Sequence, residues 1–176
     1  DADDAPLYLV GESWGAARAA QVAHALQARE RRVDGIVLVS GGWALNSEYV
    51  PAPLRRALGV VDMAAAALFH GRTAPELGRD PEVVQRAAEA WVRDTYAPAL
   101  ERRETLGDAE REAIVAGLVR FTGLDAARID RRRLEISPRQ FRTQLLPGRG
   151  REAYVFDLRR DAPPGEPARA AILRYL

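Results

Sequence analysis

The sequence contains no cysteine, which excludes a disulfide scaffold, a thiol nucleophile and a thiolate metal site. It also contains no lysine, because all 26 basic residues are arginine, and the 25 acidic residues leave a formal net charge of +1. This balance argues against a nucleic-acid binder that relies on bulk positive charge. No apolar run reaches the roughly 18 residues that a membrane-spanning helix needs. We therefore expect neither a nucleic acid nor a membrane among the partners.

The start of the chain lacks an initiator methionine and a leader pattern. Residues Asp1 to Asp4 are mostly acidic, and no basic segment followed by an apolar one precedes the first strand, so we expect no signal peptide here. The chain is then either processed or a piece of something longer. Its 176 residues, 47% of them hydrophobic and 29% charged, are typical of one globular domain.

The first 42 residues predict a strand, a helix and a second strand. Leu7–Val10 is a short apolar run ended by Gly11, which is typical of a strand buried on both faces. Small and apolar residues at helical spacing follow to about Arg31, and Ile36–Val39 is a second buried strand. Together they form one βαβ unit with a right-handed parallel crossover.

Two strands with one crossover helix cannot cover both faces of a parallel sheet, and their outer edges stay unpaired. We therefore expect this unit to be part of a larger sheet. The second strand ends at Ser40-Gly41-Gly42, an edge where α/β proteins bind ligands, although a plain loop is the favoured interpretation.

The remainder of the chain is mainly helical by pattern. The predicted helices cover Leu54–Phe69, Pro81–Leu100, Asp108–Thr122, Pro138–Leu146 and Ala168–Leu176. Asp80 before Pro81 is a good N-cap, and glycine ends two of the helices. Arg151 to Asp157 is the one stretch here that could be extended.

One motif carries chemistry. Gly11-Glu12-Ser13-Trp14-Gly15 matches G-x-S-x-G, the nucleophile elbow, and it lies between the predicted strand and the predicted helix. The serine of an elbow occupies a backbone conformation that L-residues avoid, and side chains two residues before and after it would collide with neighbouring elements. The turn lifts the hydroxyl above the sheet edge, where the helix N-terminus stabilises developing negative charge.

The sequence offers no histidine in a position to act as the general base for this serine. His24 lies about nine residues into the helix, which puts it about 14 Å from the elbow at 1.5 Å per residue. His70 follows a predicted helix, where capping or packing is the expected role. Neither histidine fits a general base.

The chain resembles the serine carboxypeptidase family of α/β-hydrolases. The resemblance rests on the elbow in its strand and helix and on segments similar to the helical insertion of bacterial members: Leu7–Gly15, Ile36–Ser40, Leu68–Arg72, Tyr96–Leu100 and Phe121–Leu124. It implies that Ser13 is the acyl-forming nucleophile and that the amide of Trp14 is an oxyanion donor. It also implies that Glu12 pairs with a second carboxyl group to bind the terminal carboxylate of a peptide.

The resemblance covers only the central portion of such an enzyme. Its other oxyanion segment lies upstream in relatives, and its catalytic aspartate and histidine lie downstream. The expected organisation is a partial α/β-hydrolase core at residues 1–42, a helical cap at 43–150 and a return segment towards the core at 151–176. The expected fold class is α/β, a partial hydrolase core followed by a mainly helical insertion.

The expected function is that of a serine-type carboxypeptidase, inactive as this chain alone, with no cofactor and no metal. Its partners would be a peptide C-terminus and the remaining hydrolase core. An esterase or acyltransferase on the same framework and a non-catalytic helical interaction module stay open as alternatives. Export or secretion follows from the resemblance only.

Overall fold

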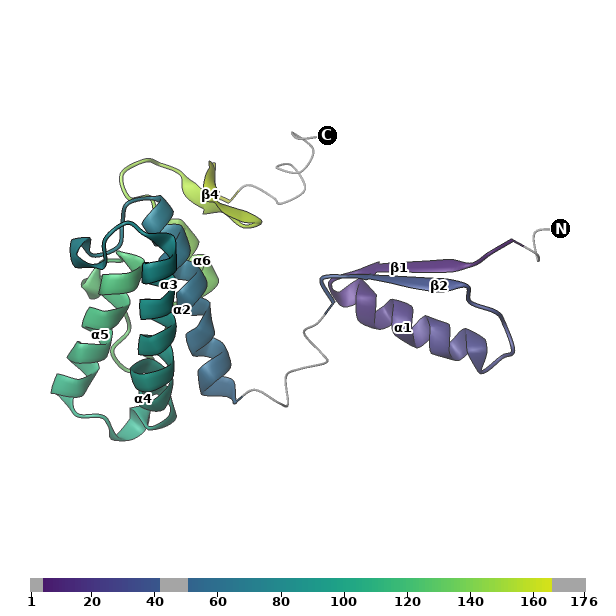
Figure 1. Ribbon diagram of the computed structural model, residues 1–176, viewed down its shortest axis with the longest axis horizontal. Coiled ribbons are helices and arrows are strands. Elements are labelled where there is room, and N and C mark those ends of the chain that lie inside the picture. The colour runs from purple at the N-terminus through teal and green to yellow at the C-terminus, as the bar shows by residue number, and fades with distance from the viewer. Residues whose placement is uncertain (1–4, 42–50, 166–176) are drawn as a thin grey trace. The chain divides into compact units, whose positions relative to one another are not determined.

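The computed structural model describes residues 5–41 and 51–165, which belong to two compact units, Asp1–Pro51 and Ala52–Leu176. The first unit contains strand β1 (Tyr8–Glu12), helix α1 (Trp14–Gln27) and strand β2 (Gly35–Val39) (Figure 1). The two strands are parallel and pair in register from Tyr8 opposite Gly35 to Glu12 opposite Val39. The predicted βαβ unit is confirmed.

Helix α1 packs on the two strands through small residues. Ala16, Ala19 and Ala23 are buried, and their short side chains let the helix backbone come close to the sheet. Among the described residues this sheet has only two strands, and its side chains are largely uncovered: Val10 is 70% exposed and Val37, its neighbour across the sheet, is 48% exposed. Parallel sheets are normally covered on both faces. The strands β1 and β2 are as apolar as those of a buried sheet, but many of their side chains are exposed.

The second unit is built mainly of helices. In chain order its elements are α2 (Ala52–Phe69), η3 (Pro75–Leu77), α3 (Pro81–Trp91), η4 (Val92–Tyr96), α4 (Ala97–Glu101), η5 (Arg103–Thr105), α5 (Asp108–Thr122), η6 (Ala126–Arg128), α6 (Pro138–Gln144), β3 (Glu152–Tyr154) and β4 (Asp157–Ala162). Helix α2 packs against α3, α4 and α5 and is the central helix of this unit. The helices predicted over Leu54–Phe69, Asp108–Thr122 and Pro138–Leu146 are confirmed as α2, α5 and α6, with ends shifted by at most two residues, and the one predicted over Pro81–Leu100 is divided into α3, η4 and α4.

The core of the second unit surrounds α2. Ala57, Ala64 and Ala67 on this helix are fully buried, and such small side chains allow neighbouring helices to approach closely. Larger side chains from α5 and the segments after it, including Phe121 and Phe141, fill the remaining space. The principal core cluster lies wholly within this unit.

The long predicted helix from Pro81 onward is interrupted by a π-helical turn, η4. Its wider spacing brings Trp91 and Tyr96, five residues apart, into parallel stacking with ring centroids 5.0 Å apart. The Tyr96 hydroxyl donates a 2.6 Å hydrogen bond to the carbonyl of Leu134, and burial raises the pKa of this phenol well above its usual value. Tyr96 is 1% exposed and belongs to the core, and the partly buried Trp91 packs against the same core cluster.

Helix ends in this unit follow local capping rules. The Asp80 carboxylate accepts hydrogen bonds from the amides of Glu82 (2.9 Å) and Val83 (3.3 Å), as the sequence predicts. Helix α5 ends at Gly123, whose φ of 65° is the left-handed conformation that glycine adopts readily.

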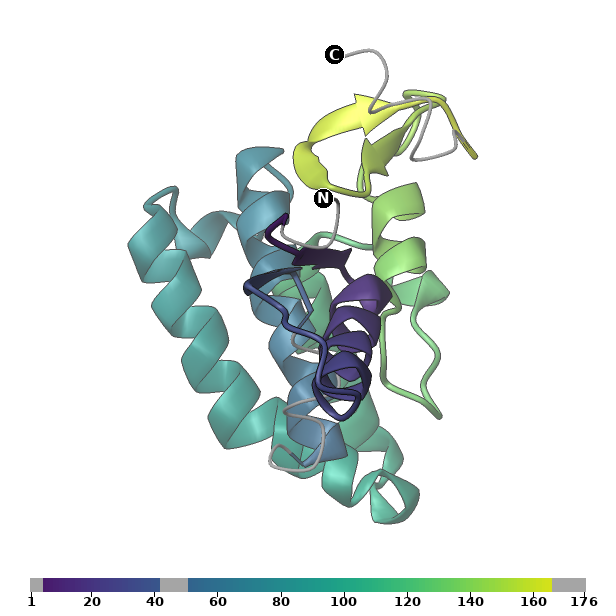
Figure 2. The same ribbon diagram turned by 90° about the vertical axis from the view of Figure 1, so that its right-hand side faces the viewer.

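Residues 151–162 form more than the single extended stretch expected. Strands β3 and β4 pair as an antiparallel hairpin with an irregularity between Ala153 and Tyr154. In both views the hairpin lies at the end of the unit where α2 ends, and it contacts α2 and α6 (Figure 1, Figure 2). The described part of the predicted return segment therefore packs on the helical unit.

The described residues are a mixture of helix and strand, 55% helical and 12% strand, which agrees with α/β in the general sense. The helix predicted over Ala168–Leu176 lies outside the described residues. The described boundary between units falls at Pro51, later than the predicted one. Within residues 5–41 and 51–165, no helix is both long and apolar enough to cross a membrane.

Candidate active site

Ser13 occupies the turn between β1 and α1. Its backbone angles are φ 52° and ψ −121°, in a region that non-glycine residues rarely adopt, and its side chain is exposed. Among the described residues, the Ser13 hydroxyl makes no hydrogen bond, including none that would cap α1. The predicted strand, strained turn and helix are confirmed, and the hydroxyl is presented to solvent.

The two glycines of the motif differ in whether a side chain would fit in their place. A Cβ atom at Gly11 would collide with the carbonyl group of Gly15 and lie 2.7 Å from the amide nitrogen of Ala16, so only glycine fits where β1 passes beneath the helix start. A Cβ atom at Gly15 would meet nothing within 4 Å among the described residues. The prediction that both glycines avoid a collision holds for Gly11 and fails for Gly15, because no described element lies beside Gly15.

Backbone hydrogen bonds hold the turn. The amide of Ser13 donates to the carbonyl of Val39 (2.8 Å), which extends the sheet pairing by one residue, and the amide of Ala16 donates to the Ser13 carbonyl (3.0 Å). Ser13 is therefore tied to β2 on one side and to the first turn of α1 on the other.

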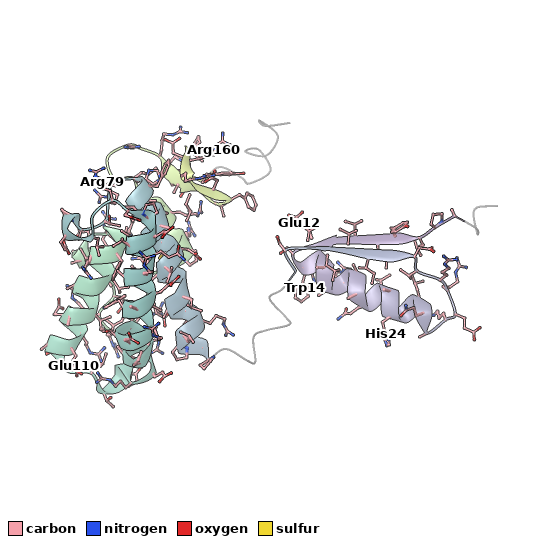
Figure 3. The ribbon with its side chains drawn as sticks, viewed as in Figure 1. Glu12, Trp14, His24, Arg79, Glu110 and Arg160 are labelled. Carbon is pink, nitrogen blue, oxygen red and sulfur yellow. The ribbon has the colours of Figure 1, made fainter. Side chains whose placement is uncertain are left out.

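Glu12 and Trp14 flank the serine on opposite sides of the turn. Trp14 is the first residue of α1, where backbone amides point out of the helix N-terminus, and its side chain is 60% exposed. Glu12 ends β1, and its exposed carboxylate makes no hydrogen bond or ion pair with a described residue (Figure 3). The second carboxyl group that the resemblance implies for Glu12 is not among its described contacts.

Ser40 and Gly41 lie at the same edge of the sheet as Ser13. Ser40 follows β2 directly, is exposed, and has a φ of 50°, the same sign of strain as Ser13. A Cβ atom at Gly41 would collide with the side chain of Ala16. The segment after β2 thus passes closely over the start of α1. The favoured interpretation of a plain loop did not predict this close approach to α1. The only feature of the sequence that indicated it was the Ser40-Gly41-Gly42 segment.

Neither histidine supplies a base. His24 is exposed and lies along α1 away from Glu12 and Trp14 (Figure 3). The Nε2 atom of His70 lies 2.8 Å from the carbonyl oxygen of Leu158, which joins the end of α2 to β4, and its ring packs edge-on against Phe69. His70 therefore has the packing role that its position predicts.

No group of three or more histidine, aspartate or glutamate side chains that could hold a metal ion occurs in the part of the chain described. Searches against family models, curated proteins and solved structures find no match to this chain. The site therefore has to be interpreted from its own geometry.

Proposed function

We propose that this chain carries the nucleophile of a serine hydrolase, with Ser13 as the acyl-forming residue. The observation that carries the proposal is the backbone of Ser13: an exposed serine at φ 52° between a parallel strand and a helix N-terminus. Strained backbone of this kind costs about 1–3 kcal/mol and persists where the surrounding structure enforces it, frequently at active sites. Here Gly11 allows β1 to pass close to the start of α1, and backbone hydrogen bonds to Val39 and Ala16 hold Ser13 on either side.

The local chemistry follows from this position. Ser13 Oγ attacks a carbonyl carbon of the substrate, and the carbonyl oxygen takes up the negative charge. The amide of Trp14, at the start of α1, would donate a hydrogen bond to that oxygen, and the helix dipole would stabilise the same charge. Collapse of the tetrahedral intermediate releases the leaving group and forms the acyl-serine, which water then hydrolyses.

The proton of Ser13 needs an acceptor. His24 lies away from the elbow, and His70 is engaged by the Leu158 carbonyl. We place the base, and the aspartate that orients it, outside this chain. The uncovered apolar strands β1 and β2 support the same view, because further strands or helices would complete such a sheet. Removal of the base leaves little of the rate of a serine hydrolase, so this chain alone should show no turnover.

Within serine hydrolases, a carboxypeptidase is the activity that we favour. Glu12 is adjacent to the nucleophile, exposed and without a described partner, and a carboxyl group there could share a proton with the terminal carboxylate of a peptide. An esterase or acyltransferase would use Ser13 and Trp14 in the same way without needing Glu12.

The test is hydrolysis of an N-blocked dipeptide by the protein expressed from its complete gene. Release of the C-terminal amino acid, lost in Ser13→Ala and weakened mainly in KM by Glu12→Gln, would support a carboxypeptidase. Hydrolysis of short acyl esters alone, unaffected by Glu12→Gln, would favour the esterase. Turnover by the 176-residue chain itself that Ser13→Ala abolishes would contradict the placement of the base outside it.

A further inference from the structure

The second unit contains a cavity of about 870 Å³ between α2, the start of α3 and the β3–β4 hairpin. This volume is within the range of about 300–1,000 Å³ typical of small-molecule sites. We name it the hairpin pocket and define it by four lining residues that the argument uses: Asp62, Phe69, Arg79 and Phe156. Arg79 lies at the end of the unit that carries the hairpin (Figure 3).

The middle of the hairpin pocket is apolar. Asp62, Ala65, Ala66 and Phe69 occupy positions i, i+3, i+4 and i+7, so they share one face of α2. This face carries a carboxylate, then two methyl groups, then an aromatic ring. Phe69 is 61% exposed and Phe156, on the hairpin, is 64% exposed. Two large aromatic side chains at one cavity are an apolar surface available to a ligand.

Charged side chains in its lining distinguish the hairpin pocket from a purely apolar cavity. The Asp62 carboxylate and the Arg79 guanidinium make no hydrogen bond or ion pair with any residue that the structure describes. The other two charged side chains in the lining satisfy each other, because Arg159 donates two hydrogen bonds, of 2.8 and 2.9 Å, to the carboxylate of Asp157. One cation and one anion are therefore left for a ligand.

The two unpaired charges lie in different parts of the pocket. Asp62 precedes Phe69 by seven residues, about 10 Å along the helix axis. Arg79 precedes the Asp80 cap of α3 and lies at the hairpin end. A ligand that satisfies both groups carries a positive charge at one end, a negative charge at the other and an apolar body between them.

We infer that the hairpin pocket binds a short apolar peptide with both termini free, its ammonium group at Asp62 and its carboxylate at Arg79. An extended chain of three residues spans about 10 Å, which matches the rise of α2 from Asp62 to Phe69, at the end of the helix beside the hairpin. The inference does not depend on Ser13, because all of its residues belong to the second unit.

The test is isothermal titration of the full chain, carrying Ser13→Ala so that no peptide is consumed, with trileucine, N-acetyl-trileucine and trileucine amide. We expect trileucine to bind, and blocking either end to weaken binding by up to about fivefold, as for exposed ion pairs. Arg79→Gln should abolish the difference between trileucine and its amide, and Asp62→Asn should abolish the difference between trileucine and its acetyl derivative. Arg86→Gln, in an exposed ion pair with Glu82 on α3, is the matched control and should change nothing.

The blocked peptides test both charges on an unaltered pocket, so a variant that fails to fold does not obscure the result. No binding of trileucine up to about 10 mM would overturn the inference. Equal affinity for all three peptides would overturn it too, since the charges would then play no part. Tighter binding of octanoate than of trileucine would also overturn it, because the pocket would then accept an apolar anion without an ammonium group.

Discussion

A single residue, Gly11, permits the tight turn that carries the candidate nucleophile. Its missing side chain lets β1 lie against the first turn of α1, and the turn that follows has a positive φ at Ser13. This feature could be predicted from the sequence because the glycine spacing is local. The strain at Ser40 could not, since it depends on where β2 meets the start of α1 across the sheet.

Replacing Gly11 tests this explanation at the residue scale. Gly11→Ala places a Cβ atom against the Gly15 carbonyl, and we expect amide protons of α1 to lose protection in hydrogen–deuterium exchange. Gly15→Ala is the matched control, because its Cβ atom meets nothing within 4 Å, and it should leave the exchange pattern of α1 intact. Equal loss of protection in both variants would refute the account.

At the scale of elements, helix boundaries were predictable and their packing was not. The Asp80 cap and the terminal Gly123 are sequence-local signals, and both function as predicted. The π-helical turn at η4 was not predicted, because the pattern continues as a helix and only the stacking of Trp91 on Tyr96 reveals the wider spacing. The hairpin was predicted only in part, as one extended stretch, because β3 has three residues and β4 carries two adjacent arginines.

A glycine on α5 tests the packing between helices. Trp91 lies so close to Gly117 that a Cβ atom there would collide with the indole, and stacking on Tyr96 and contact with Phe121 hold the ring in place. Gly117→Ala should destabilise the unit, because overpacking costs about 1–3 kcal/mol and exceeds the helix-propensity gain of about 1 kcal/mol.

The matched variant is Gly59→Ala on α2, where a Cβ atom meets nothing within 4 Å. It gains helix propensity without a collision, so the free energy of unfolding should rise by about 0.5–1 kcal/mol. Urea unfolding followed by circular dichroism measures both variants. A stabilising Gly117→Ala would show that Trp91 is free to move.

The start of α5 should respond to acid. Its Glu110 side chain accepts from the amide of Gly107 (3.0 Å), and this bond, with the ion pair to Arg102, lowers the pKa of Glu110 below the ordinary 4.5. A lowered pKa contributes stability that is present above about pH 4.5 and is lost as the pH falls through the lower folded value.

Glu110→Gln should therefore reduce the loss of stability between about pH 5 and pH 3, measured as urea midpoints at each pH. The control is Glu104→Gln, since Glu104 is 86% exposed and contacts only the neighbouring Arg103 among the partners described for it. The same dependence of stability on acid in wild type and Glu110→Gln would show that the Glu110 carboxylate does not cause it.

At the scale of the whole molecule, the two units differ in how complete they are. The second has its own core around α2, whereas the strands of the first leave side chains such as Val10 and Val37 largely uncovered. The general α/β character and the incomplete cover of the sheet could be predicted from the sequence. The exposed fraction of each strand side chain could not, because it depends on how α1 packs on the two strands.

We expect residues 52–176 expressed alone to fold cooperatively, with a thermal midpoint within a few degrees of that of the same unit in the full chain, because the principal core cluster lies inside it. Residues 1–51 alone should bind a dye for exposed apolar surface and lack cooperative unfolding. Differential scanning calorimetry makes the comparison. An unfolded 52–176 chain would contradict the division into units.

The central claim is that Ser13 is a nucleophile, and covalent labelling tests it most directly. The protein expressed from its complete gene is treated with a fluorophosphonate, and the adduct is located by peptide mass spectrometry. We predict one adduct, on Ser13, that disappears in Ser13→Ala and persists in Ser40→Ala, a second exposed serine with positive φ at the same edge of the sheet. No adduct, or an adduct on Ser40, would contradict the account.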